Sequence, residues 1–212
     1  IIRKLANRRK ALKNEAQSTI KGMKSLHEKV SAIDSHVQIV TWRNSLLGLE
    51  GSQARKYWQF LGEAVPQDWS FSSRSRRPAR DFFNAAINYG YGILYRQVEN
   101  AAFSAGLDPY LGVLHADEYR RPALVFDMIE PFRPWIDQLI IDLIHSKELS
   151  PSMFEDKNGG VFVGKKGKRI IIPALLQRLE EKKRFRKREL SRKTHIYRLA
   201  GELARTLEKL ES

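Results

Sequence analysis

The chain contains no cysteine in 212 residues. It therefore forms no disulfide, carries no thiolate nucleophile and offers no zinc–thiolate site. It also lacks any apolar run near the roughly 18 residues that a membrane-spanning helix needs. These two absences exclude a disulfide-stapled fold and an embedded membrane protein. The lack of cysteine also fits a reducing cytoplasm.

Acidic residues are scarce as well. The sequence has 24 Asp and Glu against 38 Lys and Arg, which gives a formal net charge of +14. An excess of this size favours a polyanionic partner, either nucleic acid or an anionic membrane surface. The length allows one large domain or two small ones, and we expect a single helical domain over residues 1–212. Because the chain begins Ile-Ile-Arg-Lys without a methionine, we expect it to be a piece of a longer protein.

Apolar residues recur at helical spacing along most of the chain, so we predict a mainly α, bundle-like fold. One small β-hairpin is expected near residues 161–172, between strands at 161–163 and 169–172. The predicted helices cover residues 1–31, 35–47, 50–65 and 78–105, a stretch from Pro122 to about Lys147 that is kinked at Pro131 and Pro134, and residues 173–210.

Four polar residues interrupt the apolar run that follows Pro122. Asp127, Glu130, Arg133 and Asp137 are separated by 3, 3 and 4 residues, so they share one face of a helix. A buried carboxylate is costly unless it is paired or bound to a metal. Two readings therefore stay open: an ion pair with Arg133, or carboxylate ligands of a metal ion.

Two residues elsewhere could complete a metal site. Glu50 is in line with the apolar positions of its helix, although a glutamate at a helix start can simply favour the helix dipole. His115 alone is more often a structural group. Taken with Glu130, they form a set of two carboxylates and one imidazole, which suits Mg²⁺ or Mn²⁺. On a basic protein, such an ion implies phosphodiester chemistry.

A second polar stripe lies on the helix predicted at 78–105. Asn84, Asn88, Tyr91 and Tyr95 are spaced 4, 3 and 4 residues apart, which indicates either hydrogen bonding within the core or support for a site.

Two segments are rich in basic residues and could follow a phosphate backbone, although a run of charge is usually a solvated face. They are the loop at 66–80 and the run at 182–193. The candidate DNA contacts are Arg74, Arg76, Arg77, Arg80, Lys182, Lys183, Arg184 and Arg186. The remaining histidines, including His145 and His195, are predicted to be surface groups.

Several segments resemble the CRISPR-associated integrase family (Cas-one) in its helical C-terminal domain. The matching stretches are Gly48-Leu-Glu-Gly-Ser-Gln-Ala-Arg-Lys-Tyr-Trp58, Arg77-Pro-Ala-Arg-Asp-Phe-Phe-Asn84, Asn88-Tyr-Gly-Tyr-Gly-Ile-Leu94, Gly106-Leu-Asp-Pro-Tyr-Leu-Gly-Val-Leu-His115 and Arg121-Pro-Ala-Leu-Val-Phe-Asp-Met-Ile-Glu-Pro-Phe-Arg-Pro134. The motifs cover nearly the whole chain, and the family's β-rich N-terminal domain has no counterpart in it.

The resemblance implies roles for individual residues. Glu50, His115 and Glu130 would be the catalytic metal ligands. Asp127 would support them or serve as an alternative ligand, and Arg133 would pair with Asp137. The site would be lined further by Asn84 and Tyr91.

The implied activity is the insertion of prespacer DNA into a CRISPR array in a prokaryotic cytoplasm, by attack of a 3′-hydroxyl on the repeat. The implied partners are double-stranded DNA, the small Cas-two protein and, in the full-length form, a second copy of the chain, with no membrane partner. Two alternatives predict different outcomes. A nuclease with the same site would only cut DNA, and a silent DNA-binding scaffold would not bring the three ligands together.

Overall fold

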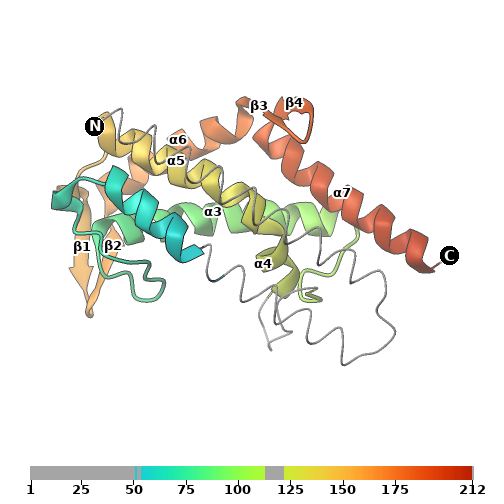
Figure 1. The fold of residues 1–212 in the computed structure, drawn as a ribbon, viewed down its shortest axis with the longest axis horizontal. Coiled ribbons are helices and arrows are strands. Elements are labelled where there is room, and N and C mark those ends of the chain that lie inside the picture. The colour runs from blue at the N-terminus through green and yellow to red at the C-terminus, as the bar shows by residue number, and fades with distance from the viewer. Residues whose placement is uncertain (1–50, 52–53, 113–121, 212) are drawn as a thin grey trace. The chain divides into compact units, whose positions relative to one another are not determined.

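The chain divides into two compact units, residues 1–55 and 56–212. The computed structural model describes residues 51, 54–112 and 122–211, so nearly everything that follows concerns the second unit (Figure 1). The helices predicted at 1–31 and 35–47 lie outside the described residues. Residues 54–64 are helical and end before Pro66, as the sequence predicts.

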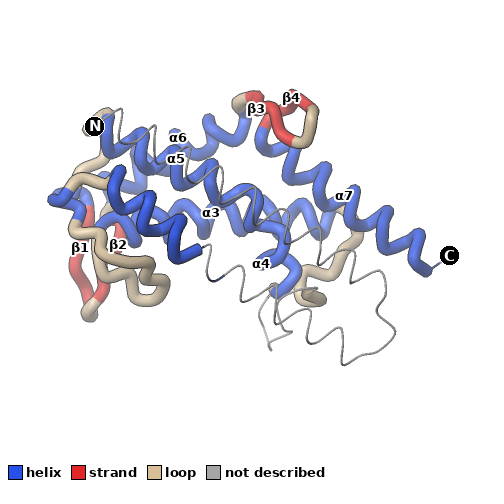
Figure 2. The backbone as a smooth tube through the Cα atoms, in the orientation of Figure 1, coloured by secondary structure: helices blue, strands red, loops and turns tan. Residues whose placement is uncertain are grey.

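Helices dominate the described residues, which confirms the predicted mainly α class, and two separate strand pairs accompany them (Figure 2). The longer elements are α3 (Phe82–Ser104), α4 (Ala123–Ile129), α5 (Arg133–His145), α6 (Lys165–Glu180) and α7 (Arg192–Glu211). Three short 3₁₀ turns are η1 (Gln67–Trp69), η2 (Glu130–Phe132) and η3 (Pro151–Met153). The strands are β1 (Phe154–Lys157), β2 (Gly160–Val163), β3 (Lys182–Phe185) and β4 (Arg188–Ser191).

Helix α3 is the central element, and it contacts α4, α5, α6, α7 and β2. It begins four residues later than predicted, because the Asp81 carboxylate caps its first turn by accepting the Asn84 backbone N–H at 2.7 Å. Its small residues allow close packing against α5. A Cβ atom added to Gly90 would lie 2.5 Å from Cγ2 of Ile136, whereas one added to Gly92 would meet nothing within 4 Å.

Prolines shape the passage from α4 to α5. Pro131 lies inside η2, the one-turn 3₁₀ segment between the two α-helices, because proline removes an N–H group and its ring crowds the preceding turn. Pro134 is tolerated in the first turn of α5. The predicted interruption is thus located at Pro131, and it places Glu130 at the start of the break.

The first hairpin lies earlier in the chain than predicted. Strand β1 pairs with β2 in antiparallel register, and Asn158-Gly159 forms the turn with φ of 53° and 72°. The strand expected at 169–172 is instead part of α6. The three consecutive isoleucines resemble a strand, but Ile171, Leu175 and Leu179 recur every four residues and form the buried face of a helix.

A second hairpin was not predicted. Strands β3 and β4 pair through residues 182–191, where the sequence suggested continued helix from residue 173. Its turn residues, Arg186 and Lys187, adopt φ of 46° and 64°. The usual glycine or asparagine signal is missing there, so the hairpin could not be recognised from its turn.

The core of the second unit lies between α3, α5, α6 and α7. Its fully buried residues include Phe83, Leu94, Phe132, Ile140 and Leu175. None of the helices in the described part of the chain combines the length and the apolar character that a bilayer crossing requires.

Candidate active site

Glu130 occupies the first position of η2, with its side chain 36% exposed. It forms an ion pair with Arg133, three residues later, whose guanidinium also lies 5.2 Å above the ring of Tyr91. The ion pair that the sequence left open is therefore present. The carboxylate nevertheless remains accessible to solvent, and it sits on a backbone segment held between two packed helices.

Asp137 lies on α5, one turn after Arg133, and is 1% exposed. Its carboxylate accepts the hydroxyl of Tyr57 at 2.6 Å and the hydroxyl of Tyr91 at 2.6 Å. Burial raises the pKa of Asp137 to about 6, while the two hydrogen bonds and the charges of Arg74 and Arg133 oppose that rise. The expected pair between Arg133 and Asp137 is wrong: Arg133 binds Glu130, and neutral tyrosines hold Asp137.

The two tyrosines act as donors over the whole physiological range. Burial first, and then the Asp137 charge, raises the pKa of Tyr57 and of Tyr91 far above the ordinary value. Each hydroxyl therefore keeps its proton and donates a hydrogen bond to the carboxylate. Residue Tyr57 was not predicted as a partner of Asp137, although the need of a buried carboxylate for donors would have justified a search among nearby tyrosines.

Arg74 differs from the other arginines of the loop at 66–80. Its guanidinium donates to Oδ1 of Asn84 at 2.8 Å and to Oδ1 of Asn88 at 2.5 Å. It also lies 5.0 Å from the ring of Trp58 and 5.6 Å from the ring of Tyr91. Desolvation by burial lowers its pKa. The predicted DNA contact is thus turned toward the protein, whereas Arg76, Arg77 and Arg80 are exposed.

The polar stripe on α3 forms hydrogen bonds with the loop at 66–80. Asn84 is fully buried, and its side-chain amide donates to the carbonyl of Ser73 at 2.8 Å and to Oδ2 of Asp81 at 2.6 Å. Its Oδ1 accepts the N–H of Ser75 at 2.9 Å. Within the stripe, Asn84 and Asn88 therefore bond to the loop, and Tyr91 bonds to Asp137.

The proposed metal ligands are only partly within the described residues. Glu50 and His115 lie outside them, and Asp127 is half-buried on α4, one turn before Glu130. Among the residues that the structure describes, no group of three or more His, Cys, Asp or Glu side chains could hold a metal ion. Convergence of Glu50, His115 and Glu130 stays a prediction.

The predicted DNA contacts of the second basic segment lie on the hairpin β3–β4. Lys182, Lys183, Arg184 and Arg186 are all exposed. The prediction that His195 is a surface group is wrong, because it is 4% exposed and its Nε2 lies 2.7 Å from the carbonyl oxygen of Lys183. It packs beneath the hairpin, on the buried face of α7, whereas His145 is exposed as predicted.

Comparison with known proteins agrees with the motifs. The family model described as CRISPR-associated protein Cas1 matches residues 1–177. A CRISPR-associated endonuclease Cas1 of Archaeoglobus fulgidus is 33% identical over 201 residues, which is 90% of this chain and 58% of that protein. A casposase bound to its integration product shares 32% identity, with a TM-score of 0.71 over 76% of this chain and 47% of the casposase.

A third similarity is to a Cas6-RT-Cas1–Cas2 complex, with 28% identity and a TM-score of 0.71 over 95% of this chain and 22% of that chain. Fold and sequence thus define a mainly helical domain of a CRISPR-associated protein. The chain belongs to the Cas1 family. It spans somewhat more than half the length of the A. fulgidus relative.

Proposed function

We propose that this domain is the catalytic part of a metal-dependent DNA integrase that inserts prespacer DNA into a CRISPR array. The observation that carries the proposal is the setting of Glu130. Its carboxylate is solvent-accessible at a helix break, directly before a buried cluster in which Tyr57 and Tyr91 immobilise Asp137. Such rigid support is what catalysis by positioning requires.

The donor chemistry suits Mg²⁺ or Mn²⁺. Glu130 supplies a hard oxygen that is accessible to solvent, and Glu50 and His115 would complete the ligand set, with Asp127 beside them. When bound, the ion would supply positive charge against the phosphate at which the reaction takes place. Arg133, paired with Glu130, would orient that carboxylate.

The reaction itself would be a transesterification at phosphorus. The 3′-hydroxyl of the prespacer attacks a repeat phosphodiester in line, so that a new P–O bond forms while the bond to the repeat 3′-oxygen breaks. That oxygen leaves with a proton, and no covalent enzyme intermediate forms. The domain would contribute position and electrostatics, with Arg76, Arg77 and Arg80 holding the DNA backbone.

Partners are proposed on the same basis. One similar structure is a Cas6-RT-Cas1–Cas2 complex, and another is a casposase bound to its integration product. We therefore assign to the full-length protein double-stranded DNA as substrate, a Cas2-type partner protein and a second copy of the chain.

The test is strand transfer with Mn²⁺ by full-length protein carrying Glu130→Gln. We expect joined product to fall at least about 100-fold, because the amide replaces a charged oxygen ligand of the metal ion that would stabilise charge on the reacting phosphate. A matched control is Glu99→Gln on α3, which removes another glutamate that is ion-paired with an arginine three residues away. The control should retain full activity, and chelation of the metal should abolish transfer in both proteins.

The products separate the alternatives. Free ends without joined strands would identify a nuclease that only cuts. Retained transfer in the Glu130→Gln protein would refute the assignment of Glu130. If the wild-type protein binds DNA but neither cuts nor joins it in Mn²⁺, the domain is a silent scaffold.

A further inference from the structure

The hairpin β3–β4 combines strong positive charge with firm attachment. Between residues 182 and 189 it carries six basic side chains and one acidic one, all exposed. Within the described part of the chain, Arg186 pairs with Glu202 at 3.5 Å, and no ion pair is formed by Lys182, Lys183, Arg184, Lys187 or Arg188. The hairpin lies beyond the residues that the family model matches.

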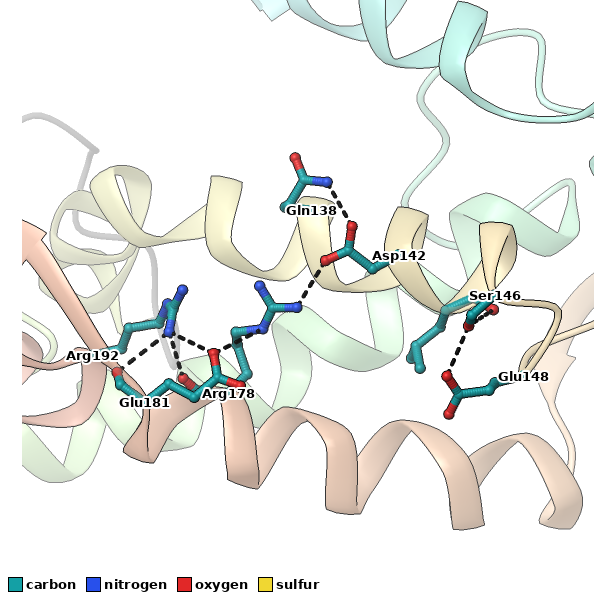
Figure 3. A network of polar contacts seen from close by, with 8 residues as sticks. Gln138, Asp142, Ser146, Glu148, Arg178, Glu181 and Arg192 are labelled. Carbon is teal, nitrogen blue, oxygen red and sulfur yellow. Dashed lines mark hydrogen bonds and ion pairs between the residues drawn. The ribbon is translucent and has the colours of Figure 1, made fainter.

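The base of the hairpin is closed by a polar network (Figure 3). Glu181 precedes β3, and Arg192 follows β4. The guanidinium of Arg192 donates to Oε2 of Glu181 at 3.0 Å, and its backbone N–H donates to the Glu181 carbonyl at 3.2 Å. Glu181 also pairs with Arg178 at 3.5 Å, and Arg178 donates to Asp142 of α5 at 2.8 Å. These contacts join the hairpin to α5, α6 and α7.

One face of the hairpin is anchored by an aromatic cluster. The ring of Phe185 lies 5.9 Å from Phe132, 5.7 Å from Trp135 and 5.4 Å from His195. Phe132 belongs to η2, the same single turn that begins with Glu130. The charged hairpin is therefore packed on the segment that carries the candidate catalytic carboxylate.

The opposite face of the hairpin carries exposed side chains. In the antiparallel register Arg184 is across from Glu189 and Lys182 is across from Ser191. Because side chains alternate along a strand, Lys182 and Arg184 share one face, about 6.6 Å apart at 3.3 Å per residue. One DNA strand carries a phosphate about every 3.4 Å along the helix axis, so two cations on one exposed face can contact separate phosphates of the same backbone.

We infer that the hairpin β3–β4 is a rigid arm that holds the phosphate backbone of duplex DNA and is fixed to the Glu130 segment through Phe185. The choice of DNA as the polyanion rests on the proposed function. The arm reads no sequence, because lysine and arginine contacts to phosphate carry no base information. Its value is positional: backbone bound by the hairpin is held at a fixed place relative to Glu130.

Binding of a random-sequence duplex across a range of salt concentrations tests the inference. The variant is Lys182→Gln/Arg184→Gln in the full-length protein. We expect affinity near 0.1 M salt to fall about 10-fold, and the slope of log K against log salt to become shallower by about 1 to 2. The control, Lys165→Gln/Lys168→Gln, removes two exposed charges from the start of α6 and should change affinity less than about threefold.

Further measurements keep the result decisive. Lys182→Arg/Arg184→Lys should bind like the wild type, which separates loss of charge from loss of fold. Equal weakening by the α6 control, or an unchanged salt slope in the hairpin variant, would overturn the inference. So would hairpin-dependent binding of phosphatidylserine vesicles in the absence of hairpin-dependent DNA binding.

The two proposals fail in different ways. At saturating DNA the hairpin variant should bind fully but transfer more slowly than the wild type, because the backbone is no longer held at a fixed place relative to Glu130. Glu130→Gln should bind DNA normally and never transfer. Transfer at the wild-type rate by the hairpin variant at saturating DNA would contradict the positional role. Normal transfer by Glu130→Gln would contradict the proposed function and leave the DNA-binding measurement unaffected.

Discussion

Helix α5 carries two aspartates, five residues apart, in opposite surroundings. Asp137 is 1% exposed and is held by the hydroxyls of Tyr57 and Tyr91. Asp142 has a side chain 47% exposed and is held by the guanidinium of Arg178 and the amide of Gln138. The first pair of contacts lies in a low-dielectric interior, and the second is screened by water. Hydrogen bonds from uncharged donors at a buried site therefore contribute more to folding stability than an ion pair at the surface.

The largest difference should appear when each carboxylate is removed. Asp137→Ala leaves two buried tyrosine hydroxyls without an acceptor, so we expect the free energy of unfolding to fall by about 4 kcal/mol. Asp142→Ala breaks exposed contacts and should cost less than about 1 kcal/mol. Urea unfolding of both variants measures the two values, and equal losses would remove the contrast between the two faces.

The pH dependence sharpens the same contrast. The pKa of Asp137 is raised in the folded state to about 6, so between pH 4 and pH 6 the folded protein binds more protons than the unfolded chain. The contribution of Asp137 to the free energy of unfolding is fully present below about pH 4 and is lost as the pH rises through 6. The loss amounts to roughly 3 kcal/mol at most. In Asp137→Asn that component should disappear. Unfolding curves of the variant that parallel those of the wild type from pH 4 to 7 would contradict the raised pKa.

A smaller effect is expected where α3 meets α5. Gly90→Ala should destabilise the protein by about 1 to 3 kcal/mol, because the new Cβ would press on Ile136, the neighbour of Asp137. Gly92→Ala meets open space and should be neutral or stabilise the helix by up to about 1 kcal/mol. Thermal melting of the pair is the measurement. A neutral Gly90→Ala would mean that the buried face of α5 yields to overpacking.

The periodic spacing of apolar residues predicted those helices that bury one regular face. The stripe Asn84, Asn88, Tyr91 and Tyr95 was visible in the sequence, and so was the break at Pro131. The first hairpin was displaced because Ile170 to Ile172 look like a strand until Leu175 and Leu179 are counted with them. The second was missed because charged strands on a protein surface need no alternation, and Arg186-Lys187 is not a typical turn.

The candidate site was predictable in its residue types but not in its pairings. Spacing placed Glu130, Arg133 and Asp137 on one face, yet it could not show that Arg133 turns to Glu130. Asp137 is bonded instead by Tyr57, which is 80 residues away in the sequence. Arg74 was grouped with its loop neighbours by composition, and only packing against Trp58 and Tyr91 distinguishes it. Long-range contacts of this kind have no local signature.

The two hairpin turns lead to one last consequence. Asn158-Gly159 is a favourable sequence for backbone with positive φ, whereas Arg186 and Lys187 adopt the same left-handed region against the preference of long side chains, at a cost of about 1 kcal/mol each. A simpler turn would give a more stable hairpin with two fewer charges at its tip. At the tip of β3–β4 the turn is thus less stable than it could be, and it carries two additional positive charges.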